Sequence, residues 1–171
     1  MRQLTEGRSR YGYDILARLV TQPLVTVRWR TPQHRAGFRA FVPADSASAW
    51  YAGGPDTITP HANAPAYGGR VAVLTSVGTA GPGEDLLVAF RNSQRGVIIG
   101  ETSAGNPSEA AAFPLPKNWS VQFSVRRDAF PDGVEFVGRG IVPEVSVSVT
   151  VRDVLAGRDA ALEKAREYLR R

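Results

Sequence analysis

The chain has 171 residues, of which 43% are apolar and 22% charged, so it is long enough for one domain with a hydrophobic core and shows no bias toward disorder. It contains no cysteine, which excludes disulfides, thiolate nucleophiles and thiolate metal sites, and we expect neither a metal nor a cofactor. The net charge of +5 comes from arginines spread along the chain, so we expect a solvated basic surface rather than a nucleic-acid site. No apolar run approaches the length of a membrane span and no targeting signal is present, which leaves the compartment open.

The first part of the chain predicts one helix, one strand and a long connection. An apolar stripe from Ile15 to Val20 indicates a helix, which we expect Pro23 to end. A short strand follows, from Leu24 to Trp29. Residues 31–69 are rich in proline, glycine, alanine and serine and predict a loop-rich segment, with at most a short helix from Asp45 to Tyr51.

The middle of the chain has the clearest pattern. Val71 to Leu74 and Val97 to Ile99 are continuous apolar runs, which are typical of strands covered on both faces. A helix with an apolar face made by Leu86, Leu87 and Phe90 lies between them. Strand, helix and strand within about 30 residues predict a right-handed parallel crossover unit.

The last part of the chain predicts two strands and two helices. Alternation from Trp119 to Val125 indicates a half-buried strand, with Trp119 in the core, and alternation from Val145 to Val149 indicates another. Thr150 to Asp153 has the pattern of a capping box at the start of a short helix that Gly157 ends. A terminal helix then begins at Asp159 and carries the apolar stripe Ala161, Leu162, Ala165, Tyr168 and Leu169.

The turn from Val77 to Glu84 joins a buried strand to a helix, the place where an α/β hydrolase presents its nucleophile. No nucleophile is present there. Glycines around Pro82 also suggest an anion-binding turn at a helix N-terminus, but the spacing lacks the lysine of a P-loop. A plain turn with Pro82 in the first helical turn is the interpretation we favour.

Several segments together resemble a known family. They are Tyr13 to Leu16 with Pro23, Gly69 to Leu74, Gly78 to Ala80 with Glu84 and Asp85, Gly100 to Thr102 with Gly105, and Asp132-Gly133 with Glu135 to Glu144. In this order and spacing they resemble the catalytic domain of the C-terminal-processing, or tail-specific, serine peptidases, especially the branch that includes the modules of interphotoreceptor retinoid-binding protein. The resemblance implies an α/β fold of the Clp protease/crotonase type, a spiral of β-β-α units, present here as a partial domain that lacks its N-terminal part. Members of this family are often exported.

The resemblance implies where catalytic groups would lie, and this chain lacks them. The nucleophilic serine of the family falls at Gly81, which has no side chain and forms no acyl-enzyme. The lysine base falls at Asn106, an amide that does not accept the proton usefully. The residue after the serine, whose N–H usually stabilises the oxyanion, is Pro82, and losing such a donor costs on the order of 3 kcal/mol. The remaining candidates to line the cleft or bind a ligand are Thr79, Pro82, Thr102, Ser103 and Gly105.

Two histidines and two serines are candidates for catalysis by residue type, and for each a purely structural role has to be considered. His34 and His61 lie in loops without an acidic neighbour in sequence, and a surface or packing role is the better interpretation of both. Ser103 and Ser108 follow the Val97 strand and are substitute nucleophiles in principle, but no evident general base lies near them in sequence.

Two glutamates and the tryptophans complete the candidates. Glu135 and Glu144 would orient a base in an intact relative, whereas in this chain we expect Glu144 to be a solvated residue before a strand. Trp29, Trp50 and Trp119 would line an apolar ligand pocket, and Trp50 is the best candidate for an exposed contact.

These observations favour a single domain, residues 1–171, that is a tail-specific peptidase homologue without peptide hydrolysis and with a cleft for a peptide or an apolar ligand. Two alternatives stay open. One is an active serine-type peptidase whose catalytic groups come from a missing segment or a partner chain. The other is an assembly or structural subunit, and a homo-oligomer is the expected state because the fold family often buries its edges in oligomers.

Overall fold

The computed structural model describes residues 9–33, 50–106 and 109–170. Its elements in chain order are α1 (Ser9–Leu16), β1 (Leu24–Val25), β2 (Arg28–Pro32), β3 (Trp50–Gly53), β4 (Thr57–Ile58), β5 (Ala72–Thr75), α3 (Pro82–Ser93), β6 (Val97–Gly100), β7 (Ala110–Leu115), the 3₁₀ turn η1 (Pro116–Asn118), β8 (Trp119–Ser124), β9 (Arg127–Ala129), β10 (Val145–Ser146), α4 (Val151–Leu155) and α5 (Ala160–Arg170). No helix of the described ranges is long and apolar enough to cross a bilayer.

A small parallel sheet has the strand order β10-β6-β5. α3 connects β5 to β6 and is buried along nearly its whole length, from Gly83 to Phe90. It packs against α1, whose Leu16 is buried in the same apolar cluster as Leu87, Phe90 and Ile98. The predicted strand, helix, strand unit is therefore confirmed, because continuous apolar runs become buried strands when helices cover the sheet.

A second sheet is antiparallel, with order β3-β2-β9, and β1 pairs with β4. The predicted strand Leu24 to Trp29 is thus two strands that belong to different sheets. The predicted helix over Asp45 to Tyr51 is wrong for Trp50 and Tyr51, which lie in β3, while 45–49 fall outside the described residues. Pairing with β2 overrides the local sequence preference there, since backbone groups find partners across the ladder.

α1 ends at Leu16, well before Pro23. The chain then turns through bonds that span three residues, from the N–H of Arg18 to the carbonyl of Ile15 and from Leu19 to Leu16. These turns bring Val20 into the core and point Ile15 to solvent, with 56% of Ile15 exposed. Proline only forbids a helix from continuing past it, so it sets a limit and not the end point.

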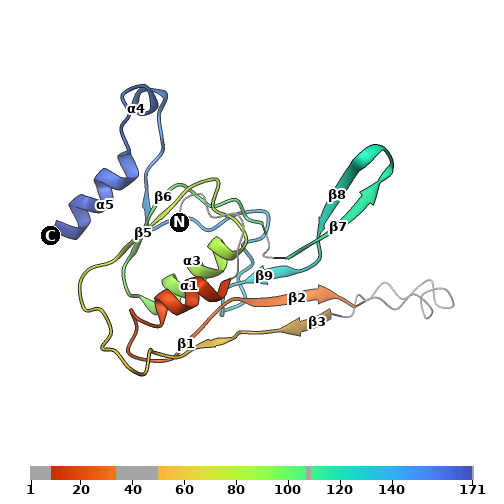
Figure 1. Ribbon diagram of the computed structural model, residues 1–171, viewed down its shortest axis with the longest axis horizontal. Helices are drawn as coiled ribbons and strands as arrows, with labels where there is room; N and C mark the ends of the chain where they lie inside the picture. Colours follow the sequence, from red (N-terminus) through yellow and green to blue (C-terminus); the bar gives the residue numbers. More distant parts are fainter. Residues whose placement is uncertain (1–8, 34–49, 107–108, 171) are drawn as a thin grey trace.

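β7 and β8 form a separate two-stranded hairpin that extends away from the remaining described residues (Figure 1). Trp119 is 71% exposed there, and Phe123 is 54% exposed. The prediction of a half-buried strand with Trp119 in the core is therefore wrong. Period-two alternation shows that one face is apolar, but it does not show that anything covers that face.

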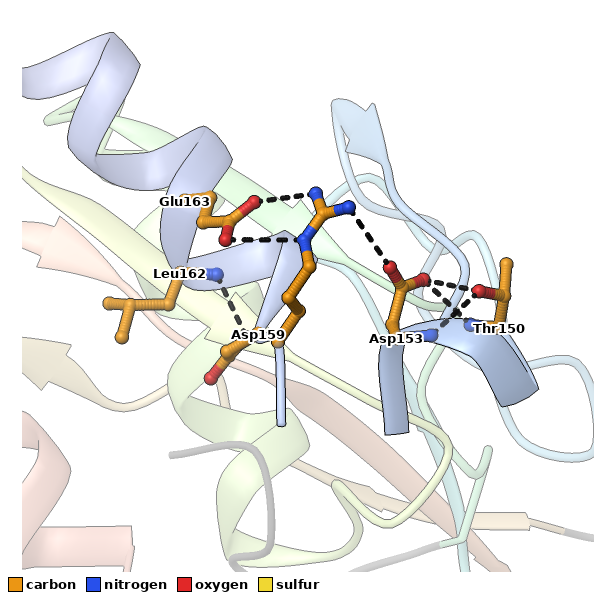
Figure 2. Close-up of polar contacts among 6 residues, drawn as sticks. Thr150, Asp153, Asp159, Leu162 and Glu163 are labelled. Atoms are coloured by element: carbon orange, nitrogen blue, oxygen red, sulfur yellow. Dashed lines mark hydrogen bonds and ion pairs between the residues drawn. The ribbon is translucent and has the colours of Figure 1, made fainter. Parts of the chain in front are cut away.

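The C-terminal segment follows its predicted pattern for the two helices. Thr150 caps α4, its hydroxyl accepting from the N–H of Asp153 at 3.1 Å while the Asp153 carboxylate accepts from the Thr150 N–H at 3.1 Å (Figure 2). Gly157 has φ 61° and ends the segment. Asp159 caps α5 through the N–H of Leu162 at 2.9 Å (Figure 2). Arg158 bridges the two helices by pairing with Asp153 and Glu163.

The strand before these helices is shorter than its sequence pattern predicts. Val145 and Ser146 form β10, whereas Val147 to Val149 leave the sheet after one further bond, from the Val147 N–H to the Gly100 carbonyl. β6 ends at Gly100, so the ladder offers no further partners of β6 for these residues.

Candidate active site

The site is built on the turn between β5 and α3. β5 ends at Thr75, and α3 begins at Pro82, so Gly81 is the N-cap residue of α3. Gly81 has φ 51° and ψ −116°, a conformation that side-chain-bearing residues rarely adopt. Hydrolases that carry a nucleophile on a strand-to-helix turn hold it on a similarly sharp and strained backbone. The turn therefore has the shape of a nucleophile turn while its apex is glycine.

The loop after β6 lies directly against this turn. The N–H of Ala104 donates to the carbonyl of Thr79 at 2.9 Å, and the N–H of Gly81 donates to the carbonyl of Asn106 at 3.3 Å. Gly81 and Asn106, which are far apart in the sequence, are therefore neighbours. Thr79 and Gly81 are buried, and Asn106 is exposed.

Glu84, in the first turn of α3, holds the two segments together. Its side chain is fully buried, and it accepts hydrogen bonds from the Ser103 hydroxyl, the N–H of Gly105 at 2.7 Å and the N–H of Asn106 at 2.9 Å. The Ser103 hydroxyl in turn accepts from the N–H of Ile141 at 2.7 Å. A buried carboxyl group needs such partners, because an unsatisfied one costs several kcal/mol (about 2–7).

Burial raises the pKa of Glu84 above its ordinary value of 4.5, although the hydrogen bonds from Ser103 and from backbone N–H groups act in the opposite direction. Glu84 and Asp85 both lie in the first turn of α3, where negative charge complements the helix dipole. This end of α3 therefore already holds its acidic groups, which argues against the alternative of an anion-binding turn.

A third segment, residues 136–141, closes the other side of the loop. The N–H of Gly138 donates to the carbonyl of Gly105 at 2.7 Å, and the N–H of Ser103 donates to the carbonyl of Ile141 at 3.2 Å. Gly105 has φ 73°, and a Cβ added there would lie 2.6 Å from the N of Gly140. Glycine is required at Gly105 both by the backbone angle and by the close approach of the neighbouring backbone.

The chemistry available in this arrangement is limited. Gly81 supplies no nucleophilic atom, Pro82 supplies no N–H, and Asn106 supplies an amide, which is not a useful base. Ser103 is buried, and both hydrogen-bonding roles of its hydroxyl are occupied by Glu84 and Ile141. Within residues 9–33, 50–106 and 109–170, no group of three or more His, Asp or Glu side chains could hold a metal ion.

The sequence model of peptidase family S41 matches residues 7–147 of this chain. The chain belongs to peptidase family S41. No curated protein matches the sequence. The S41 assignment confirms the coarser part of the predicted resemblance, the relation to tail-specific peptidases.

Solved structures of other proteins share its fold. A Parabacteroides merdae protein assigned to the peptidases aligns with a TM-score of 0.74 and 20% identity over 95% of this chain and 48% of its own length. Mature CPAF complexed with lactacystin aligns with a TM-score of 0.66 and 14% identity over 95% of this chain and 40% of its own. The photosystem II D1 C-terminal processing protease aligns with a TM-score of 0.50 and 24% identity over 86% of this chain and 33% of its own. The chain thus spans about half or less of their length, and the predicted α/β fold of this family is confirmed.

Within this S41 fold, the structure brings together the cleft residues predicted from the sequence. Thr79, Pro82, Ser103 and Gly105 lie on the two segments that meet at the turn. Thr102 is half-buried beside Gly140, since a Cβ on Gly140 would lie 2.8 Å from the Thr102 methyl carbon. Their roles in this S41 chain stay predictions.

The two predicted candidates His34 and Ser108 lie outside the described residues. His61 is half-buried. Its ring Nδ1 accepts a hydrogen bond from the backbone N–H of Asn63 at 3.3 Å, and its backbone N–H donates to the carbonyl of Ala17 at 2.8 Å. These contacts fit a packing role for His61.

The two glutamates are held by arginines. Glu135 accepts from Arg30 at 2.5 Å and pairs with Arg127 at 3.2 Å. Desolvation by burial raises the pKa of Glu135, but the hydrogen bonds from Arg30 and Arg127 outweigh this effect and hold the pKa below its ordinary value. Glu144 accepts from Arg91 at 2.8 Å and from the N–H of Ile98 at 2.7 Å, so the expectation of a merely solvated residue needs correction.

The tryptophans lie on other elements of the fold. Trp29 and Trp50 are in the antiparallel sheet, where the Arg30 guanidinium covers the Trp50 ring at 4.4 Å, and Trp119 is in the hairpin. Trp50 is 39% exposed, in agreement with its expected place at the surface.

The organising role of Glu84 is the main feature that sequence reasoning missed. The sequence places Glu84 three residues after Gly81, in the first turn of a helix whose next residues are apolar. A glutamate in a continuously buried helical run was the available signal, because acidic residues are almost never fully buried without partners.

Proposed function

We propose that this chain is an S41 homologue that does not hydrolyse peptide bonds and that binds peptide segments at the Gly81 turn. The observation that supports this proposal is the direct contact between Gly81 and Asn106. These are the positions where the family resemblance implies a serine and a lysine, and neither residue supplies a nucleophile or a base. A serine-type mechanism requires both within hydrogen-bonding reach of each other.

The ligand class is carried over from the fold relatives. The photosystem II D1 C-terminal processing protease is, by its name, an enzyme that processes a polypeptide at its C-terminus. We extend this ligand class, peptides, to the present chain as part of the proposal. The Glu84 network supports a binding role, because it fixes the turn and the loop with buried hydrogen bonds whether or not a nucleophile is present. An apolar ligand is the alternative, and it rests on the resemblance to the retinoid-binding branch.

The proposal is tested with the unaltered chain, the variant Gly81→Ser, and the triple variant Gly81→Ser, Pro82→Ala, Asn106→Lys. Each is incubated with fluorogenic peptides and with a serine-reactive fluorophosphonate probe. We expect no turnover and no labelling of the unaltered chain or of Gly81→Ser, because the base and the oxyanion donor are still missing. Labelling at position 81 in the triple variant would show that the turn geometry is competent once the groups are restored.

Binding is measured separately, by fluorescence anisotropy of labelled peptides that end in a free carboxylate, compared with amidated peptides of the same sequence and with a retinoid-like apolar probe. Saturable peptide binding without hydrolysis supports the proposal. Turnover by the unaltered chain after rigorous purification contradicts it and favours the alternative in which catalytic groups come from elsewhere. That alternative is considered because the chain spans only 48% of the length of the Parabacteroides merdae protein.

A further inference from the structure

The hairpin β7–β8 has no partner strand among the described residues. It is a two-stranded sheet of its own, it is joined to the body through β9, and it extends into solvent (Figure 1). An isolated two-stranded hairpin is marginally stable in water, and it usually needs a further strand or a packed face. The hairpin therefore exposes a surface that the described residues of its own chain do not cover.

One face of this hairpin is entirely apolar. Residues directly opposite each other in an antiparallel pair, and residues two apart along a strand, share a face. The observed register places six apolar side chains on that face, here called the hairpin face: Ala111, Phe113, Leu115, Trp119, Val121 and Phe123. Phe113 and Phe123 are in ring contact at 5.9 Å, and the other face is mixed, with Ser120, Gln122 and Ser124.

We propose that the hairpin face packs against the hairpin face of a second copy of this chain. The charge distribution favours this occupant. The chain carries a net charge of +5, so two copies repel one another across most surfaces, whereas from Ala110 to Ser124 the only charged residue is Lys117, in the turn at the tip. An uncharged apolar face can meet its own copy in a two-fold contact without charge repulsion, and it carries no charge pattern that would select a different protein.

The exposed area is in the range that a weak dimer needs. Aromatic side chains bury about 150–250 Å² each, so Phe113, Trp119 and Phe123 at 52%, 71% and 54% exposure offer on the order of 270–440 Å² per copy. Leu115, which is 48% exposed, and the aliphatic side chains add to this area. Two copies together approach the ~1,000 Å² at the lower limit of specific interfaces. The dimer is therefore expected to be reversible and dependent on concentration.

Face-to-face packing fits better than addition of a strand at an edge. Pro114 lies within β7, and proline is tolerated in a strand where its missing N–H faces outward. An added strand would lack that hydrogen bond, which is a common way to block edge pairing. Pro114 thus disfavours pairing at the edge of β7, and we take the free face as the surface that self-association uses.

The absence of cysteine from the chain allows a direct test by cross-linking. Ala111→Cys places a single thiol on the hairpin face and keeps all the aromatic side chains, and the adjacent Ala112→Cys places one on the opposite face of the same strand. With a short bifunctional maleimide we expect covalent dimer from Ala111→Cys and at least about tenfold less from Ala112→Cys. Equal yields from the two variants would show random collision and overturn the proposal.

The equilibrium is tested by sedimentation velocity between about 1 and about 100 µM, a range that covers weak interfaces. Phe123→Lys adds a charge to the hairpin face, and Gln122→Lys adds the same charge to the opposite face. We expect the unaltered chain and Gln122→Lys to dimerise with rising concentration and Phe123→Lys to require at least about tenfold more protein. A chain that stays monomeric throughout, or a dimer that Phe123→Lys leaves unchanged while circular dichroism shows both variants folded, overturns the proposal.

Discussion

Gly81 has no side chain, and it stands at the position where we predict the family's nucleophilic serine. Its backbone angles, φ 51° and ψ −116°, belong to a region that glycine enters without steric cost. A serine at the same place would have to be held there by its surroundings, which is a common feature of catalytic turns. Glycine therefore adopts this turn without strain, and at the position where we predict the family's serine it supplies no reactive oxygen.

Replacing Gly81 by serine should destabilise the chain by about 1–3 kcal/mol, the usual cost of holding a side-chain-bearing residue in such a conformation. The measurement is the free energy of unfolding from urea titration. Gly78→Ser is the matched control, because Gly78 lies in the same turn and is not among the glycines with positive φ. A stability of Gly81→Ser equal to that of Gly78→Ser would mean that the turn adapts without strain.

Ser103 is an anchoring residue in this structure. Its hydroxyl donates to Glu84 and accepts from the N–H of Ile141, so it joins three segments of the chain. Ser103→Ala should cost about 1–3 kcal/mol, because a buried N–H and a buried carboxyl group each lose a partner. The midpoint of thermal unfolding reports this loss, and Ser124→Ala, at an exposed position, should change it little.

α4 is a very short helix that depends on its cap. Thr150 and Asp153 make reciprocal hydrogen bonds at its start, and Val151, Val154 and Leu155 are exposed, so packing contributes little (Figure 2). Local hydrogen bonds must therefore supply most of its order.

We expect Thr150→Ala to cost about 0.5–2 kcal/mol of local stability, whereas Thr150→Ser should keep most of it because serine is an equally good N-cap residue. Amide hydrogen exchange in α4 measures the effect. If the exchange rate of α4 increases as much in Thr150→Ser as in Thr150→Ala, the effect comes from loss of the threonine methyl group and not from loss of the cap.

Elements whose partners are close in sequence were predicted well. The β5-α3-β6 unit and the capped helices follow from apolar runs and capping residues, and these signals act over one or two turns. β1 and β2 were predicted poorly, whereas for the hairpin strand β8 the alternation gave the apolar face but not its exposure. Strand pairing joins residues that are distant in the sequence, so Leu24 and Arg28 can enter different sheets although they lie four residues apart.

The buried carboxyl group of Glu84 should make the stability of the folded chain depend on pH. Its pKa is raised by burial, so between its ordinary value of 4.5 and the raised value the folded state binds more protons than the unfolded state. Stability from this group is therefore fully present below pH 4.5 and is lost as the pH rises through the raised pKa.

This effect is measured as the difference in unfolding free energy between the unaltered chain and Glu84→Gln at a series of pH values. We expect the difference to shift against the unaltered chain as the pH rises above 4.5 and then to level off. Glu135, whose pKa is lowered, loses its stabilisation as the pH falls and is present in both proteins, so it cancels. A difference that does not vary with pH would mean that Glu84 titrates normally.

The sequence by itself determined the S41 relation and the parallel crossover unit, and it predicts that Gly81, Asn106 and Pro82 stand where the family has its serine, base and oxyanion N–H. These depend on residue identity and local pattern. Only the tertiary structure decided that Gly81 touches Asn106, that Glu84 holds both segments, and that Trp119 lies in solvent. The physical reason is that hydrogen bonding and burial depend on which distant segments meet, and residue type alone does not specify this.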